Sequence, residues 1–240
     1  MPKTFLQARW RYLVMANYAV APEVLQPYLP SGTRLDFHGG VTYVSLVGFL
    51  FEKTRLFGVP VPFYGDFEEV NLRFYVLGEE DDMHRRGVVF IRETVPYRPV
   101  AFLANLLYSE HYESKRMSHE IRQTDSGLQV AYTWQGKGHG QHIRVEASDP
   151  ARPMESGSKE EFILEHYYGY TRISETVSER YRVEHPSWQV HDVKRCDVEC
   201  DFGGMYGPDF SPLAGRLPDS VFLAQGSEVK VEWERFRFSR

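Results

Sequence analysis

Hydrophobic and polar residues alternate along much of this chain, which is the pattern of β-strands with one buried face. In the segment Glu69–Leu77, one face carries Val70, Leu72, Phe74 and Val76, and the other carries Glu69, Asn71, Arg73 and Tyr75. The segment Val41–Phe51 is apolar at nearly every position and predicts a strand buried on both faces. The same patterning predicts further strands over residues 87–95, 127–136, 142–148, 188–193 and 221–233.

Helical patterns are few. A short helical turn is expected over residues 22–30, where Pro22 stands near the start and Pro30 ends it. A buried helix is expected over residues 98–112, and a third helix over 158–170, opened by a capping box of Ser158 and Glu161. The Gly-Gly pair in DFGGMYG (residues 201–207) is interpreted as a turn.

This pattern predicts a mainly β fold, with antiparallel strands that close into a barrel or form a sandwich, and about three short helices. The polar faces of the strands then line an internal cavity or face solvent, and the spacing alone does not separate these two alternatives.

Composition narrows the class of protein. The chain has 240 residues, of which 42% are hydrophobic and 15% aromatic, and one domain over residues 1–240 is expected. The net charge of −5 argues against a nucleic-acid partner, and no apolar run is long enough for a membrane span. Arg9, Trp10 and Arg11 stand where a signal peptide needs its apolar segment, so a cytoplasmic location is expected.

The cysteines and histidines predict no metal site and no cofactor. Cys196 and Cys200 belong to an alternating strand-like pattern, in which positions four apart are separated by roughly 13 Å, so both are expected to be small core residues. His139 and His142 form an H-x-x-H pair, but it is surrounded by glycines and lacks a third ligand nearby.

One charged pair stands out. Lys115 and Arg116 are adjacent in HYESKRM, directly after the expected helix. A neighbouring cation in an apolar site disfavours the charge of a lysine and makes its amine nucleophilic. The alternative is a solvated cation in a polar loop, with Glu113 and Glu120 as partners. His111, beside the pair, is either an acid–base group or an ordinary hydrogen-bonding loop residue.

The strings ANYAVAPEVLQPYLPSGTRLDFHGGVTYVSLVGFLF, FEEVNLRFYV, GVVFIRE and VPYRPVAFLANLLYSEHY resemble the YqjF-like uncharacterised proteins. That family in turn resembles the acetoacetate decarboxylase-like superfamily. The resemblance implies a largely antiparallel barrel or cone around a central cavity. It favours the alternative in which Glu69, Asn71, Arg73 and Tyr75 face that cavity.

The resemblance also implies a Schiff-base mechanism, in which a lysine attacks a keto acid. Lys115 matches the nucleophile, Arg116 its cationic neighbour, and Glu69 a glutamate near the pair. The enzyme's tyrosine-proline before the pair is absent here, and its first-strand arginine falls near Asn17 or Tyr18. The candidate catalytic residues are therefore Lys115, Arg116 and Glu69, and the candidate ligand-binding residues are Arg73, Asn71, Tyr75, Tyr18 and His111.

Three functional hypotheses follow. The first is a barrel that binds a small organic, keto-acid-like ligand in its cavity. The second is a Schiff-base lyase that uses Lys115. The third is a structural or interaction module with a filled interior. The expected partner is a small molecule, without nucleic acid or membrane, and self-association into a homo-oligomer stays open.

Overall fold

The computed structural model describes residues 4–79, 85–108, 110–136 and 140–239 and is mainly β, as the patterning predicts. The strands of the large sheet and its short extensions are β1 (Thr4–Val20), β2 (Thr33–Leu35), β3 (Thr42–Leu56), β4 (Val59–Pro60), β5 (Phe67–Gly78), β6 (Arg85–Val95), β7 (Tyr112–Ser114), β11 (Tyr168–Arg172), β12 (Val177–Glu184), β13 (Val190–His191) and β15 (Ser220–Ser239). A smaller sheet contains β8 (Met117–Thr124), β9 (Gly127–Gln135), β10 (Gly140–Ala147) and β14 (Val193–Glu199).

Strand pairing in the large sheet returns to its own start. The order β5-β3-β1-β15-β12-β11-β6 is followed by a further pairing of β6 with β5, so these strands enclose an interior. Most pairings are antiparallel, but β6 pairs in parallel with both β7 and β11. The sheet is therefore largely antiparallel, as expected, with β6 as the strand that also makes parallel pairings.

The helices are short and partly differ from the expectations. They are α1 (Pro22–Leu25), α2 (Arg98–Tyr108), α3 (Lys159–Leu164) and α4 (Phe202–Tyr206), with 3₁₀ turns at Gln26–Tyr28 and Pro208–Leu213. The N-cap half of the expected capping box is present, since Oγ of Ser158 accepts from the Glu161 amide, but the Glu161 carboxylate accepts from the Gly157 amide instead of the Ser158 amide. Helix α3 ends at Leu164, and Tyr168 already begins β11. The DFGGMYG segment, expected as a turn, forms the short helix α4. The Asp201 carboxylate caps the start of this helix by accepting from the Gly204 amide.

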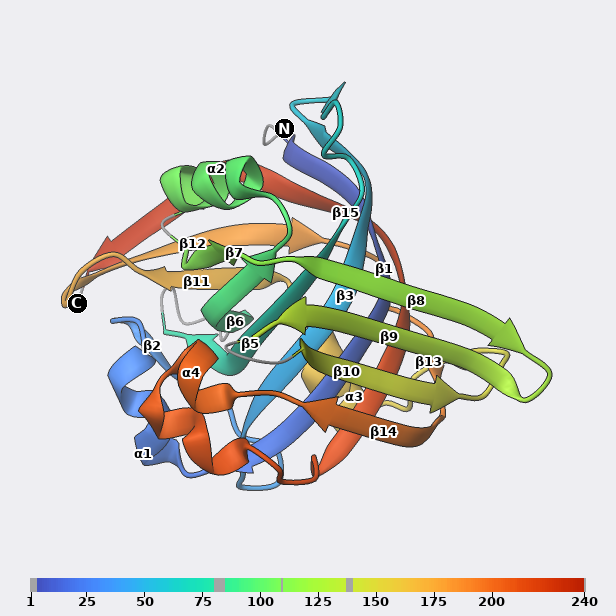
Figure 1. Cartoon of the computed structure of the whole chain (residues 1–240). Coiled ribbons are helices and arrows are strands. Elements are labelled where there is room, and N and C mark those ends of the chain that lie inside the picture. Colours follow the sequence, from blue (N-terminus) through green and yellow to red (C-terminus); the bar gives the residue numbers. More distant parts are fainter. Residues whose placement is uncertain (1–3, 80–84, 109, 137–139, 240) are drawn as a thin grey trace.

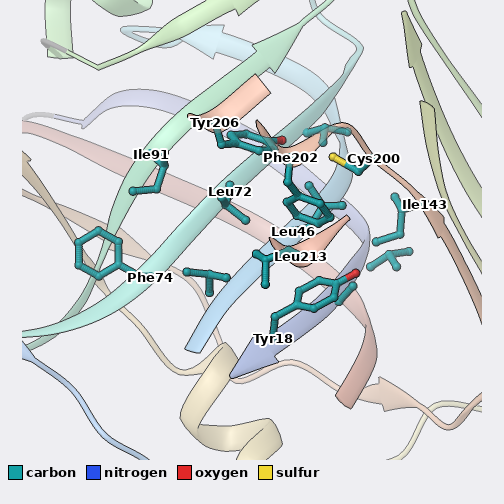
Figure 2. Close-up of a cluster of buried hydrophobic side chains, with 14 of the residues drawn as sticks. Tyr18, Leu46, Leu72, Phe74, Ile91, Ile143, Cys200, Phe202, Tyr206 and Leu213 are labelled. Carbon is teal, nitrogen blue, oxygen red and sulfur yellow. The ribbon is translucent and has the colours of Figure 1, made fainter. Parts of the chain in front are cut away.

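The strands β1, β3, β5 and β6 are buried on both faces, because each face contributes to a different core. One face packs against the small sheet and α4, and Figure 2 shows this core around Leu46, Leu72, Phe202 and Tyr206. The other face points inward and packs against α3 through Phe162, Ile163 and Leu164. The prediction for β3 is confirmed, since every residue from Thr42 to Phe51 is buried.

The small sheet extends to one side of the molecule, and α2 lies near the end where β1 begins (Figure 1). Cys200 is buried and Cys196 is half-buried against the outer core, both as free thiols, in agreement with the interpretation of these residues as core side chains. No helix in the described ranges is both long and apolar enough to cross a membrane.

Candidate functional site

A cavity of about 310 Å³ lies on the inner face of the large sheet. Strands β1, β3, β5, β6 and β12 supply its walls, and α2 closes one side with Val100, Leu103, Ala104 and Leu107. Most of the lining is apolar and much of it aromatic, including Trp10, Phe49, Phe51, Phe67, Phe90 and Trp188. The polar lining includes a set of mostly buried side chains: Glu69, Asn71, Arg73, Glu93, Glu110, Tyr112, His166, Tyr181 and His185. Small-molecule sites typically combine an apolar wall with a few polar groups in this way.

Glu69 on β5 lies at the centre of one polar group. Its side chain is 3% exposed, its Oε1 accepts from Nδ2 of Asn71 over 2.9 Å, and its Oε2 accepts from the Tyr112 hydroxyl over 3.2 Å. Burial raises the pKa of Glu69 to about 7, and the two hydrogen bonds oppose that rise. Glu69 therefore exchanges its proton near neutral pH, where a general acid or base works best.

Two further glutamates share this end of the cavity. Glu93 on β6 is 2% exposed, and burial together with the nearby Glu110 and Glu69 raises its pKa well above the ordinary value. Glu110 accepts from the hydroxyls of Thr171 and Tyr181 over 2.8 and 3.2 Å, and burial raises its pKa to about 8. Like charges in one buried site disfavour ionisation of each other, so this end holds protons at neutral pH.

Arg73 lies two positions along β5 from Asn71 and forms a second, basic end. Its guanidinium donates to the Ile163 carbonyl and contacts the sulfur of Met15. His166 stands nearby, with its ring 4.8 Å from that of Tyr75, and His185 stacks between Tyr167 and Trp188. Burial lowers the pKa of both histidines, so both imidazoles are neutral at neutral pH.

Several polar atoms in this lining have no hydrogen-bond partner in the described part of the protein. They are Nε1 of Trp10, Oγ1 of Thr54, Oδ1 of Asn71, Nε of Arg73, Oε2 of Glu93 and both ring nitrogens of His166. Buried polar groups are nearly always paired, because an unpaired one loses its hydration without compensation. Six such side chains around one cavity therefore indicate that a ligand or water completes their hydrogen bonding.

The structure brings together part of the residue set expected from the sequence. Glu69, Asn71 and Arg73 line the cavity, as the alternation on β5 predicts. Tyr75 points to the same side but lies behind the lining, where its hydroxyl is 2.5 Å from Oγ of Ser45 and its ring contacts Phe162 and His166.

The remaining candidates lie outside the lining. Nζ of Lys115 pairs with Oε1 of Glu113 over 3.0 Å, and Arg116 is exposed. Glu113 is on the face of β7 opposite to Tyr112, where it also accepts from the Thr94 hydroxyl. The arrangement matches the solvated-pair alternative, although the Lys115 side chain is only 22% exposed. The catalytic roles of Lys115 and Arg116 stay predictions, and no contact in the described structure supports them.

His111 and Tyr18 are also placed elsewhere. His111 is exposed, while its neighbours Glu110 and Tyr112 point into the cavity. Tyr18 is fully buried on the other face of β1, with its ring edge-on to Phe202 in the outer core (Figure 2). Their ligand-binding roles likewise stay predictions without a supporting contact.

Sequence reasoning missed Glu93, Glu110, Tyr112, His166 and His185. Strict alternation from Val88 and Phe90 assigns Arg92 to the inner face, but a bulge in β6 opposite Leu72 and Arg73 shifts the phase, so Glu93 faces inward instead. The one available signal was the presence of a glutamate in an apolar strand, GVVFIRETV.

His166 was missed because the helix was expected to continue past it.

In the described part of the chain, no group of three or more His, Cys, Asp or Glu side chains has an arrangement suited to a metal ion. The H-x-x-H pair is tested only in part, because His139 lies outside the described residues; His142 pairs with Asp197.

Comparison with solved structures shows the fold. An acetoacetate decarboxylase-like enzyme from Sphingomonas wittichii RW1 superposes with a TM-score of 0.66 at 10% identity, covering 98% of this chain and 94% of that chain. The enduracididine biosynthesis enzyme MppR complexed with pyruvate gives 0.66 at 12% identity, covering 99% and 91%. Acetoacetate decarboxylase from Legionella pneumophila gives 0.62 at 10% identity, covering 96% and 86%.

The inner cavity and the ring of paired strands thus belong to an acetoacetate decarboxylase-like fold, as the sequence resemblance implied. No curated protein matches the sequence. The family model that matches, over residues 7–228, is DUF2071, described as an uncharacterized conserved protein (COG2071). This match covers most of the 240 residues, so the chain belongs to the DUF2071 family.

Proposed function

We propose that this protein binds a small organic molecule in the cavity between Glu69 and Arg73. The observation that carries the proposal is the set of buried polar atoms without partners on Asn71, Arg73, Glu93 and His166, all of which line one largely apolar cavity. A ligand with an apolar body and polar groups at one end would satisfy both kinds of lining. The cavity volume of about 310 Å³ suits a small metabolite and argues against the alternative of a filled interior.

The nature of the relatives supports binding of this kind. MppR, which has the same fold, is complexed with pyruvate. A lysine Schiff base is not part of the proposal, because no lysine is among the described residues that line the cavity. Within the cavity, the buried carboxyls and Tyr112 are the groups placed to transfer protons to or from a bound ligand.

The test uses a variant that blocks the cavity. Ala104 on α2 lines the cavity, and Ala104→Phe places a ring in the space that a ligand would occupy. Ala131→Phe is the matched control, because Ala131 is on the outer face of the small sheet. A panel of small metabolites is screened by thermal unfolding, since a ligand at a hundred times its Kd stabilises the folded state by about 2.7 kcal/mol.

We expect at least one compound to raise the Tm of the unmodified protein and of Ala131→Phe but not of Ala104→Phe. Equal shifts in all three proteins, or no shift with any compound, would overturn the proposal. Native mass spectrometry of the freshly purified protein gives a second readout, because a retained metabolite appears as a discrete added mass that Ala104→Phe lacks.

A further inference from the structure

Three of the unpartnered atoms in the cavity, on Asn71, Glu93 and Arg73, differ in hydrogen-bonding character. Oδ1 of Asn71 can only accept, and a ligand cation beside Glu93 would favour the ionised form of that carboxyl, whose Oε2 then accepts. Nε of Arg73 can only donate. A single ligand that satisfies all three must therefore present donors to one side and acceptors to the other. This step rests on the proposed function, that is, on the cavity holding a ligand.

The acceptor side is built by neighbouring strands. Asn71 and Glu93 lie directly opposite each other in the β5–β6 ladder, where facing Cβ atoms are about 5 Å apart. Tyr112 is the register partner of Glu93 on β7 and donates to Glu69. None of the ion pairs in the described part of the chain involves Glu69, Glu93 or Glu110. Three buried carboxyls thus meet without a direct ion pair among the described residues, and the nearby Arg73 opposes the rise in the pKa of Glu69 only in part.

The donor side is Arg73. Its side chain is 8% exposed, and in the described structure no carboxylate lies within the ion-pair distance of 4.0 Å. Its contacts are the Ile163 carbonyl at 3.3 Å and the Met15 sulfur at 3.5 Å, neither of which carries a charge. A buried guanidinium is costly without an anion and is suited to grip a carboxylate through two parallel hydrogen bonds.

Charge balance then separates three classes of ligand. A simple amine would pair with the carboxyls but leave Arg73 without an anion. A simple carboxylate would pair with Arg73 but bring no donor of its own to Oδ1 of Asn71. A zwitterion satisfies both sides and adds no net charge to the buried site.

The spacing fits such a molecule. Asn71 and Arg73 are two residues apart on one strand, so their Cα atoms are separated by roughly 7 Å. A ligand between these side chains therefore needs its ammonium and its carboxylate close together on one carbon skeleton, as in an amino acid. The apolar walls, with Phe49, Phe67 and Trp188 among them, accommodate an apolar substituent.

We propose that the ligand is an amino acid or a close amino-carboxylate with an apolar side chain, held with its ammonium at Glu93 and Asn71 and its carboxylate at Arg73. The aromatic rings of the wall, such as those of Phe49 and Phe67, then contact the side chain.

The test uses three matched probes measured by isothermal titration calorimetry on the full chain at pH 7.5. L-phenylalanine carries both charged groups, 3-phenylpropanoate lacks the amine, and 2-phenylethylamine lacks the carboxylate. We expect L-phenylalanine to bind about tenfold to a hundredfold more tightly than either analogue, since each lost charge-assisted hydrogen-bonding group weakens binding to that extent.

Two variants assign the groups to their partners. Glu93→Gln should remove the advantage of L-phenylalanine over 3-phenylpropanoate and keep its advantage over 2-phenylethylamine. Arg73→Met should remove the advantage of L-phenylalanine over 2-phenylethylamine and keep its advantage over 3-phenylpropanoate. Glu113→Gln and Arg92→Gln are the matched controls, because these two residues form an ion pair on the other face of the sheet and should leave both ratios unchanged.

The comparison on the unmodified protein decides the matter even where a variant fails to fold. Equal binding of L-phenylalanine and either analogue would overturn the inference. It would also be overturned if Glu93→Gln removed the advantage over 2-phenylethylamine, or if Arg73→Met removed the advantage over 3-phenylpropanoate. Tighter binding of pyruvate than of L-phenylalanine would also overturn it. If none of the three probes binds while the metabolite screen succeeds, the zwitterion inference fails and the proposed cavity function stands.

Discussion

The hydroxyl of Tyr112 donates a hydrogen bond to Oε2 of Glu69 over 3.2 Å, which joins β7 to β5 across Glu93 on β6. Because this hydrogen bond ends on a cavity-lining carboxyl, it shows that the Tyr112 side of β7 faces the cavity. Side chains alternate along a strand, so the next residue faces the other way. Tyr112 is inward, so Glu113 and its partner Lys115 belong to the outward side. One hydrogen bond therefore links the buried carboxyls into a group and separates them from the cationic pair.

Removal of the Tyr112 hydroxyl should raise the pKa of Glu69 further above about 7. In Tyr112→Phe the ring remains, but the hydrogen bond that favours the ionised carboxylate is lost. The pKa is measured from the pH dependence of the Glu69 side-chain carboxyl ¹³C shift. Tyr132→Phe is the control, because its hydroxyl donates to the Tyr12 carbonyl on the far side of the sheet. A Glu69 pKa that is unchanged or lowered in Tyr112→Phe would contradict the assignment.

The free energy of unfolding should fall as pH rises from 6.5 to 9. Burial raises the pKa of Glu69 to about 7 and of Glu110 to about 8, compared with 4.5 ordinarily, so the folded state holds protons that the unfolded state has released. Stability contributed in this way is complete below pH 4.5 and is lost as pH rises through the folded pKa values. Each carboxyl still protonated in the folded state contributes a slope of about 1.4 kcal/mol per pH unit.

The histidines act in the opposite direction but at lower pH. The pKa values of His166 and His185 are lowered by burial, so they reduce stability only when pH falls below 6.5 and the unfolded histidines take up protons. Above pH 6.5 the expected pH dependence of stability therefore comes from the two carboxyls. Urea denaturation across this range should show a shallower slope in Glu110→Gln and an unchanged slope in Glu113→Gln. A stability that rises with pH in the unmodified protein would refute the prediction.

The predictable part of this structure is the part set by local periodicity. The two-sided burial of β3 and the inward face of β5 follow from side-chain alternation, and both are confirmed. Glu69, Asn71 and Arg73 were found because β5 has no irregularity of its own that changes the phase of its side chains.

The rest depends on tertiary structure. Glu93 faces inward because of a bulge whose extra residue is on β6, and no local residue pattern in GVVFIRETV specifies that position. The sequence match to a distant enzyme predicted Lys115 as a nucleophile. The direction of its side chain, however, depends on how β7 pairs with β6, and a sequence match does not specify that register. His166 and His185 reach the cavity from segments far apart in the chain, so their proximity has no signature in sequence spacing.

The amine of Lys115 should not form a Schiff base with a keto acid. It pairs with Glu113 at 3.0 Å and is not among the cavity-lining side chains, so a carbonyl compound in the cavity does not meet it. Incubation with pyruvate or acetoacetate followed by borohydride should leave the mass of Lys115-containing peptides unchanged. Lys115→Arg gives the background from surface lysines. An adduct on Lys115 that is absent from this variant would restore the lyase hypothesis.

Substitution of Tyr18 by Phe should stabilise the protein and leave ligand binding unchanged. The Tyr18 hydroxyl is fully buried in the outer core and has no hydrogen-bond partner in the described structure, so its removal relieves a desolvation cost of about 1 kcal/mol. The ring and its edge-on contact with Phe202 are kept. Urea denaturation measures the stability, and calorimetry with the best cavity ligand measures the affinity. A weakened affinity in Tyr18→Phe would return this residue to the ligand-binding set, and a loss of stability would mean that its hydroxyl is paired after all.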